Sequence, residues 1–121
     1  MKIDFDNNVA IYIQIVELIK KYIISGYFKS GDRLPSIRDL ALQFKVNPNT
    51  MQKALGELEE LKLIYTERTN GKFVTNDLNL INKLKNEYAL DLTSKYILNM
   101  NNLGFAKNEI IKHIESNGGI K

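Results

Sequence analysis

Apolar residues along the first quarter of the chain recur at intervals of three and four. This spacing predicts an amphipathic helix over residues 10–25 that ends at Gly26, a residue that adopts a left-handed conformation cheaply. The predicted apolar face consists of Ile11, Ile15, Leu18, Ile19, Tyr22 and Ile23. Pro35 disfavours a helical conformation in the residue before it, so residues 33–34 are expected to be extended.

Two shorter helices are predicted next, separated by a turn at residues 45–47. Ser36 would cap a helix over residues 37–44, and Asp39 follows three positions later as a capping-box partner. Asn47 would cap a helix that begins at Pro48, because the first helical position tolerates proline. This helix is expected to run to about residue 61. The residues expected to hold the two helices together are Ile37, Leu40, Ala41, Val46, Met51 and Leu55. Phe44 belongs to the apolar face predicted for the first of them, and Leu58 and Leu61 to that of the second.

A hairpin is predicted after the third helix. Residues 64–67 and 72–75 have the composition of short strands, and Asn70 and Gly71 between them both tolerate positive φ. The order of helix, extended stretch, helix, tight turn, helix and hairpin is that of a winged helix-turn-helix.

The C-terminal part of the sequence predicts two more helices. Asp77 would cap a long helix over residues 78–99, a polar break would follow at 99–102, and a short helix would span about 107–116. The tail 117–121 is expected to fray. The predicted architecture is mainly α (α+β), with a winged helix-turn-helix domain at residues 1–76 and a helical dimerisation or regulatory segment at 77–121.

Composition excludes several classes of function. The 121 residues contain no cysteine and a single histidine, which leaves no disulfide framework, thiolate metal site or imidazole-based triad. Because no nucleophile, base and orienting group stand together, the chain is not expected to be an enzyme or to need a cofactor or metal. No leader-like segment opens the sequence, and no apolar run approaches the ~20 residues that span a bilayer. A cytoplasmic protein without a membrane partner is therefore expected.

The net charge of +3 is small, but it is concentrated in one region. Between residues 33 and 53 four basic residues stand against one acidic residue, a local surplus of +3. No acidic residue occurs from 40 to 56, so the exposed end of the third helix would meet phosphates without repulsion. Asparagine and glutamine pair with adenine, and threonine offers a hydroxyl to phosphate and a methyl group to thymine. Double-stranded DNA is the predicted partner; the alternative is a winged-helix adaptor that binds another protein.

Two sequence runs resemble the GntR family of bacterial transcription regulators. They are Leu34-Pro35-Ser36-Ile37-Arg38-Asp39-Leu40-Ala41 and Val46-Asn47-Pro48-Asn49-Thr50-Met51-Gln52-Lys53-Ala54-Leu55, followed by Leu58-Glu59. The Val-Asn-Pro-Asn-Thr run and the short C-terminal part are similar to the YtrA subfamily. The motifs cover about residues 9–75, and residues 76–121 match by length and pattern only.

The resemblance implies roles for individual residues. Arg38 matches a DNA-contacting arginine, residues at the start of the third helix match positions that touch phosphates or bases, and Gly71 matches a glycine at the wing tip. Lys53 and Lys72 are added for their charge and placement. The predicted DNA-binding set is Arg33, Ser36, Arg38, Asn47, Pro48, Asn49, Thr50, Gln52, Lys53, Asn70, Gly71 and Lys72.

The chain departs from the family pattern at several positions. Lys62 stands where the family usually has a glycine, and a left-handed lysine would cost on the order of 1 kcal/mol. Thr69 replaces the first glycine of the wing, which affects the fine geometry expected there. Ala10 and Ala106 stand where the family often has a proline and a capping residue.

The C-terminal segment is too short to enclose a ligand pocket of ~300 Å³ by itself. Its apolar stripe, Ile81, Leu84, Tyr88 and Leu92, is expected to form a homodimer interface; packing against the first helix of the same chain is the alternative. The resemblance implies a homodimeric repressor of its own transporter-type operon, bound to a palindromic operator. A small-molecule effector is left open.

Overall fold

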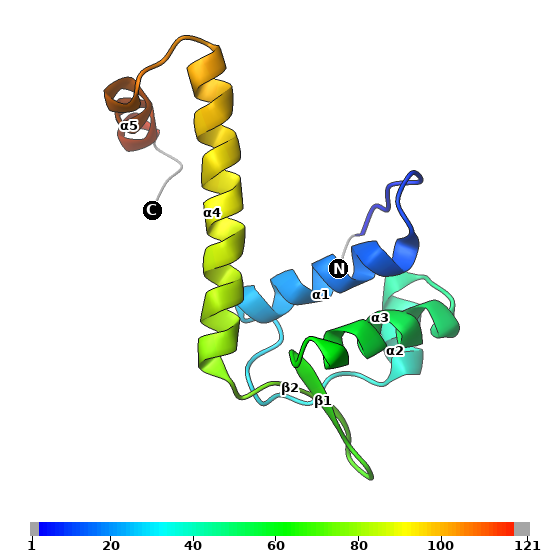
Figure 1. The fold of residues 1–121 in the computed structure, drawn as a ribbon. Coiled ribbons are helices and arrows are strands. Elements are labelled where there is room, and N and C mark those ends of the chain that lie inside the picture. The colour runs from blue at the N-terminus through cyan, green and yellow to red at the C-terminus, as the bar shows by residue number, and fades with distance from the viewer. Residues whose placement is uncertain (1–2, 118–121) are drawn as a thin grey trace. The chain divides into compact units, whose positions relative to one another are not determined.

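The computed structural model describes residues 3–117, so residues 118–121 of the predicted frayed tail lie outside it (Figure 1). The described part holds five helices and one hairpin. Their bounds are α1 Ile11–Ser25, α2 Ile37–Phe44, α3 Pro48–Glu60, β1 Ile64–Glu67, β2 Gly71–Val74, α4 Leu78–Asn102 and α5 Lys107–Ser116. The predicted mainly helical α+β class is confirmed.

The chain divides into two compact units, Met1–Lys83 and Leu84–Lys121. This boundary falls within α4, whereas the sequence placed it at 76/77. The first turns of α4 belong to the N-terminal unit, and Ile81 in them is buried.

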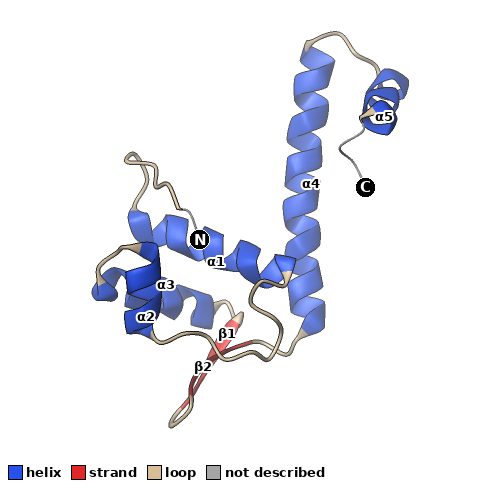
Figure 2. Cartoon of the chain, turned by 180° about the vertical axis from the view of Figure 1, so that it is seen from behind, coloured by secondary structure: helices blue, strands red, loops and turns tan. Residues whose placement is uncertain are grey.

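The N-terminal unit is built around α3. α1 and α2 both pack against α3, and α3 also contacts β1 (Figure 2). The loop of the hairpin projects away from the three helices. The fully buried side chains are Phe44, Ile15, Ile19, Leu40, Met51, Leu55, Leu58, Ile64 and Val74. Each such side chain contributes about 1.5–3 kcal/mol through its removal from water.

All three predicted helix caps are present, including Asp77, whose carboxylate accepts from the Leu80 N–H at 3.1 Å. The Ser36 hydroxyl oxygen accepts a hydrogen bond from the backbone N–H of Asp39 at 3.1 Å. The Asn47 side-chain oxygen accepts one from the backbone N–H of Asn49 at 2.8 Å. These bonds satisfy N–H groups that have no partner within their helices, and they set where α2 and α3 begin.

Two lysines end the helices of the helix-turn-helix in a left-handed conformation. Lys62 has φ 66° and Lys45 has φ 56°. After α3, Leu63 N–H donates to the Leu58 carbonyl and Lys62 N–H to the Glu59 carbonyl, both at 3.0 Å. This pair of bonds is a Schellman motif, which usually employs glycine at the left-handed position. Of the two possibilities that the sequence left open at position 62, a left-handed lysine or a different helix end, the structure shows the left-handed lysine.

Two residues of the predicted apolar faces are exposed. Leu61 has 47% of its surface exposed, because α3 ends at Glu60 and Leu61 lies beyond the last helical turn. Ile11, at the first position of α1, is 45% exposed. Burial in α1 instead includes Val16, which the predicted face omitted.

The hairpin is joined by the extended stretch that precedes α2. β1 and β2 are antiparallel, with Thr66 opposite Lys72 and Glu67 opposite Gly71. On the other side of β2, Arg33 forms an isolated bridge with Phe73, and Leu34 N–H donates to the Lys72 carbonyl at 2.8 Å. The start of the helix-turn-helix is thereby tied to the wing. β2 begins one residue earlier and ends one residue earlier than predicted.

In the C-terminal unit, α4 continues to Asn102, so the predicted end at residue 99 is wrong. The polar run 99–102 remains helical, and the helix stops at Gly104, which has φ 97°. Phe105 N–H donates to the Met100 carbonyl at 3.1 Å, the bond that closes a Schellman motif. Glu109 accepts from the Ala106 N–H at 3.0 Å, which is one half of a capping box; the other half is missing because the Ala106 side chain has no acceptor.

Candidate nucleic-acid interface

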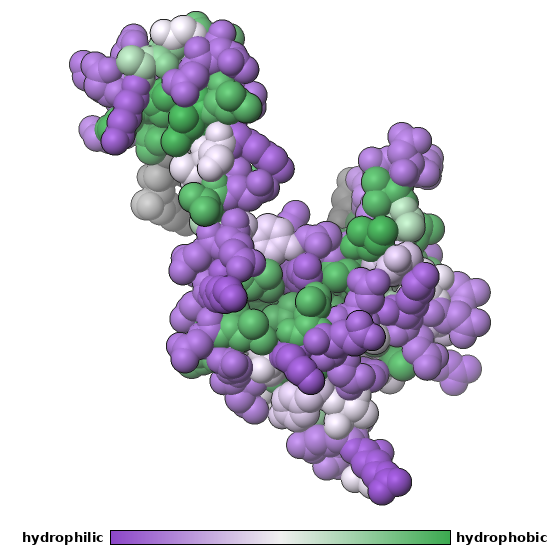
Figure 3. Space-filling model, in the orientation of Figure 1, coloured by the Kyte–Doolittle hydropathy of each residue, from purple (hydrophilic) through white to green (hydrophobic). Residues whose placement is uncertain are grey.

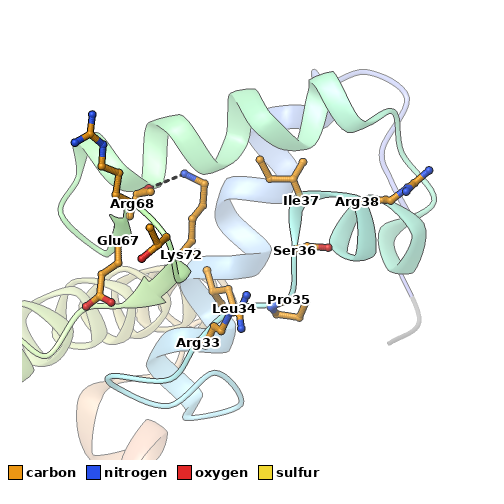
Figure 4. A pocket seen from close by; sticks show the side chains of 12 residues that line it. Arg33, Leu34, Pro35, Ser36, Ile37, Arg38, Glu67, Arg68 and Lys72 are labelled. Atoms are coloured by element: carbon orange, nitrogen blue, oxygen red, sulfur yellow. Dashed lines mark hydrogen bonds between the residues drawn. The ribbon is translucent and has the colours of Figure 1, made fainter.

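All three arginines of the sequence line one groove of the N-terminal unit. The groove has a volume of about 430 Å³ and lies between the stretch 33–36, the start of α2 and the hairpin. Figure 4 shows Arg38 and Arg68 toward opposite ends, with Arg33 between them. We call this feature the arginine groove; its lining is Arg33, Leu34, Pro35, Ser36, Ile37, Arg38, Thr66, Glu67, Arg68, Thr69, Gly71 and Lys72.

The groove unites predicted residues from two separate parts of the sequence. Arg33, Ser36 and Arg38 come from the region before and within α2. Gly71 and Lys72 come from β2. Glu67 is the one acidic residue in the lining, so arginine and lysine dominate its charge.

Arg68 is a member of the groove that sequence reasoning missed. It lies in the hairpin loop, is exposed, and makes no ion pair or hydrogen bond with residues 3–117. The signal available in the sequence was its position beside Asn70-Gly71, where a wing arginine would project. The charge count, which stopped at residue 53, did not include it.

Gly71 has a backbone conformation that favours glycine, and the Arg33 side chain lies close to it. Its φ is 99°, which L side chains rarely adopt, and a Cβ atom there would lie 3.2 Å from Nε of Arg33. The Arg33 guanidinium therefore lies against the backbone of the wing. The predicted glycine at the wing tip leaves room for this arginine.

Two predicted cations already have partners within the chain. Lys72 donates from Nζ to the Thr66 hydroxyl at 2.8 Å and lies 3.8 Å from a Glu59 carboxylate oxygen. The Lys53 Nζ lies 3.9 Å from the centre of the Tyr12 ring, in cation–π geometry. The Arg38 side chain, by contrast, is exposed and makes no ion pair or hydrogen bond with the part of the chain that the structure describes.

The N-terminal half of α3 presents the predicted polar surface. Asn47, Pro48, Asn49, Gln52 and Lys53 are exposed, and Thr50 is half-buried. The first turn of α3 contains no acidic residue. None of these side chains lines the arginine groove, so the N-terminal unit presents two separate sets of polar groups.

Other predicted contacts are used in part by the fold. Ser36 and Asn47 serve as caps through their oxygen atoms. The Asn70 side chain donates to a Glu67 carboxylate oxygen at 3.1 Å and so closes the hairpin loop.

The residues predicted to form the dimer interface differ in exposure. Leu92 is 65% exposed, and Leu84 and Tyr88 are half-buried. Ile81 is only 8% exposed in the single chain, which leaves little of its surface for a partner. Figure 3 shows further apolar residues at the surface of the C-terminal unit. The large exposed ones are Leu90, Leu92, Tyr96, Ile97, Leu98, Leu103, Ile111 and Ile114.

The described residues contain no group of three or more His, Cys, Asp and Glu side chains that could hold a metal ion. Within residues 3–117, no helix combines the length and apolar character needed to cross a membrane.

Comparison with known proteins supports a regulatory role. Residues 11–74 match the family "Bacterial regulatory proteins, gntR family". The chain is 32% identical over 112 residues to the uncharacterized transcriptional regulator YhcF of Bacillus subtilis, which covers 93% of both chains. It is 39% identical over 77 residues to the transcriptional repressor YtrA of B. subtilis, covering 64% of this chain and 59% of YtrA.

Solved structures give the same result. A GntR family regulator from Listeria monocytogenes is 43% identical, with a TM-score of 0.82 over 92% of this chain and 97% of the other. The DNA-binding domain of AraR in complex with operator ORX1 is 28% identical, with a TM-score of 0.55 over 62% of this chain and 96% of that domain.

The relatives named above are regulators, which agrees with the expectation that the chain is not an enzyme. The chain therefore belongs to the GntR family of bacterial regulatory proteins, as a transcriptional regulator with a winged helix-turn-helix, and its similarity to YtrA supports the YtrA subfamily.

Proposed function

We propose that the chain is a homodimeric repressor that binds a palindromic operator of its own operon, a transporter-type operon, in the cytoplasm. α3 enters the major groove and the hairpin residues 68–72 enter the adjacent minor groove. The observation that carries this proposal is the arginine groove, in which all three arginines of the chain gather; the first turn of α3, which contains no acidic residue, adds to it.

The charge of the groove favours a polyanion as its ligand. Arg38 and Arg68 have no partner among the described residues, and bringing such cations together costs free energy unless a phosphate neutralises them. Arginine binds phosphate through two parallel hydrogen bonds, which fixes the orientation of the protein on the duplex.

The exposed polar residues of α3 make the sequence-specific contacts with the bases. Asn49 and Gln52 carry side-chain amides that can donate and accept at the same adenine edge. Thr50 is half-buried and close to the helix start, a position suited to a phosphate contact. The AraR domain, whose structure contains operator DNA, supports this arrangement by analogy.

The apolar surface of the C-terminal unit supports the dimer. Leu92, Leu103 and other large apolar residues there are exposed in the single chain, and an apolar surface of this kind marks an interface between proteins. A second copy of the chain is the proposed occupant, because two-fold symmetry would present two α3 helices to a palindromic site.

Binding to the DNA just upstream of the protein's own gene tests the proposal. A labelled duplex of that region and a scrambled duplex of the same composition are titrated with protein at two salt concentrations. We expect a preference for the upstream duplex and a log–log salt slope steeper than about −3. Weak, salt-insensitive binding to both duplexes would overturn DNA binding and favour the adaptor alternative.

The dimer is tested by light scattering during gel filtration. We expect a mass twice the 13.9 kDa of the chain. Leu92→Asp places a charge in the apolar surface and should shift the mass to that of one chain. Leu42→Asp is the matched control, because Leu42 is 71% exposed on α2, outside the C-terminal unit. A wild-type monomer would contradict the dimer without affecting DNA binding.

A further inference from the structure

Three polar side chains join the end of α3 to both strands of the wing. The Thr66 hydroxyl donates to a Glu59 carboxylate oxygen and accepts from Lys72 Nζ at 2.8 Å. Lys72 Nζ also lies 3.8 Å from the same Glu59 oxygen. Figure 4 marks the bond from Lys72 with a dashed line. We call Glu59, Thr66 and Lys72 the wing triad.

The triad connects elements that the hydrogen bonds of the hairpin do not connect. Thr66 and Lys72 are opposite each other in the β1–β2 register, whereas Glu59 belongs to α3. A hairpin of two four-residue strands is marginally stable by itself and bends easily. A bond from α3 to the middle of this hairpin therefore limits how far the wing can swing relative to α3.

The other side of the wing is held separately. Arg33 bridges to Phe73, and its guanidinium lies against Gly71. The wing is thus restrained on one side by the stretch before α2 and on the other by the triad.

We propose that Glu59, Thr66 and Lys72 are positioning residues that hold the wing at the distance from α3 needed for simultaneous major-groove and minor-groove contacts. This role rests on the proposed DNA-binding function. The ammonium group of Lys72 is used within the triad, and the phosphate contact of the wing belongs to Arg68.

A substitution at Glu59 distinguishes positioning from simple electrostatics, because the two predict opposite changes. If Glu59 only competed with phosphate for Lys72, then Glu59→Ala would release a cation and tighten binding, with a steeper salt slope. If the triad positions the wing, Glu59→Ala weakens operator binding, by roughly tenfold. The affinities of the wild type and of Glu59→Ala are measured by polarisation titration of the upstream duplex.

Glu60→Ala is the matched control. Glu60 is the next residue of α3 and is exposed, and its side chain makes no ion pair or hydrogen bond among residues 3–117. The Glu60→Ala substitution removes the same charge as Glu59→Ala but leaves the triad intact. Its affinity for the upstream duplex should therefore stay within about threefold of the wild-type value or become tighter.

Thr66→Val tests the triad without any change of charge. It retains the shape of the side chain but removes the hydroxyl that bonds to Glu59 and Lys72. In hydroxyl-radical footprinting, protection of the minor groove flanking the α3 site should be lost, whereas major-groove protection from methylation should persist. Thr66→Ser should restore the minor-groove protection, because it restores the hydroxyl.

Thermal denaturation of each variant, monitored by circular dichroism, checks that the variant is folded. Among folded variants, a wild-type footprint for Thr66→Val, or tighter binding by Glu59→Ala, would overturn the positioning role while leaving the proposed function intact. A wild-type chain that fails to bind the upstream duplex would overturn the proposed function, and the positioning role with it.

Discussion

Lys53 Nζ lies 3.9 Å from the centre of the Tyr12 ring, so a residue of α1 holds a cation of α3. An exposed cation–π contact of this kind contributes about 0.5–1 kcal/mol. It also limits the directions in which the Lys53 ammonium can extend toward a bound duplex.

This contact predicts a measurable coupling between the two residues. We expect Tyr12→Leu to lower the free energy of unfolding, and Lys53→Met to cost less in the Tyr12→Leu background than in the wild type. The difference between the two costs should be about 0.5–1 kcal/mol, measured by urea denaturation of the four proteins. Equal costs in both backgrounds would show that the ring and the ammonium do not interact.

Arg38→Ala should weaken binding to the upstream duplex by more than tenfold. Arg38 is exposed in the arginine groove and has no partner among the described residues, so its loss removes a bidentate contact without disturbing the fold. The measurement is a polarisation titration at constant salt. Lys112→Ala, which removes a cation of α5, is the control and should bind like the wild type. Unchanged affinity for Arg38→Ala would exclude it as a contact.

Arg68→Ala should weaken binding to the upstream and scrambled duplexes by similar factors. A wing arginine that contacts phosphate carries little sequence information, and its loss should reduce the magnitude of the log–log salt slope by about 1. Lys21→Ala, which removes an exposed cation of α1, is the control. A salt slope that stays at the wild-type value would argue against the phosphate contact.

Gly71→Ala should lower the free energy of unfolding by about 1–2 kcal/mol. Part of this cost comes from φ 99°, and part from the 3.2 Å approach of the new Cβ to Arg33 Nε. The same substitution in an Arg33→Ala background should cost less, because the close contact is gone. Urea denaturation measures both. If Gly71→Ala lowers the free energy of unfolding equally in both backgrounds, the whole loss comes from the backbone conformation and none from the contact with Arg33.

Lys62→Gly should stabilise the protein by roughly 0.5–1 kcal/mol, because glycine adopts the left-handed conformation without the clash of a Cβ atom. The φ of 66° at Lys62 already forms the Schellman motif, so the fold should not change. Thermal or urea denaturation gives the stability, and Lys21→Gly, in the interior of α1, should be destabilising by contrast. A loss of stability in Lys62→Gly would contradict the prediction.

Most of the fold could be predicted because its signals act over short distances. Helix spacing, the caps Ser36 and Asn47, and the turn at Asn70-Gly71 each depend on residues within about one turn of the chain. The end of α4 was misplaced for a related reason: asparagine permits a helix to continue, and the stop at Gly104 is a local signal that the polar run obscured.

The candidate site was predicted in part. The residue types at the start of α3 are visible in the sequence, since no packing is needed to expose them. Arg68 was missed because it shares a groove with Arg33 and Arg38 only in the folded chain, where residues thirty or more positions apart in sequence line one surface.

The sequence by itself determined the order of the elements, their caps and turns, and the concentration of basic charge near α3. Only the tertiary structure decided which cations are held within the chain and which remain available. Lys72 lies beside Glu59 and Thr66, Lys53 lies over Tyr12, and Arg38 and Arg68 extend along one groove. The physical reason is that backbone preferences act between near neighbours, whereas the partners of a side chain are set when packing brings distant segments within a few ångströms.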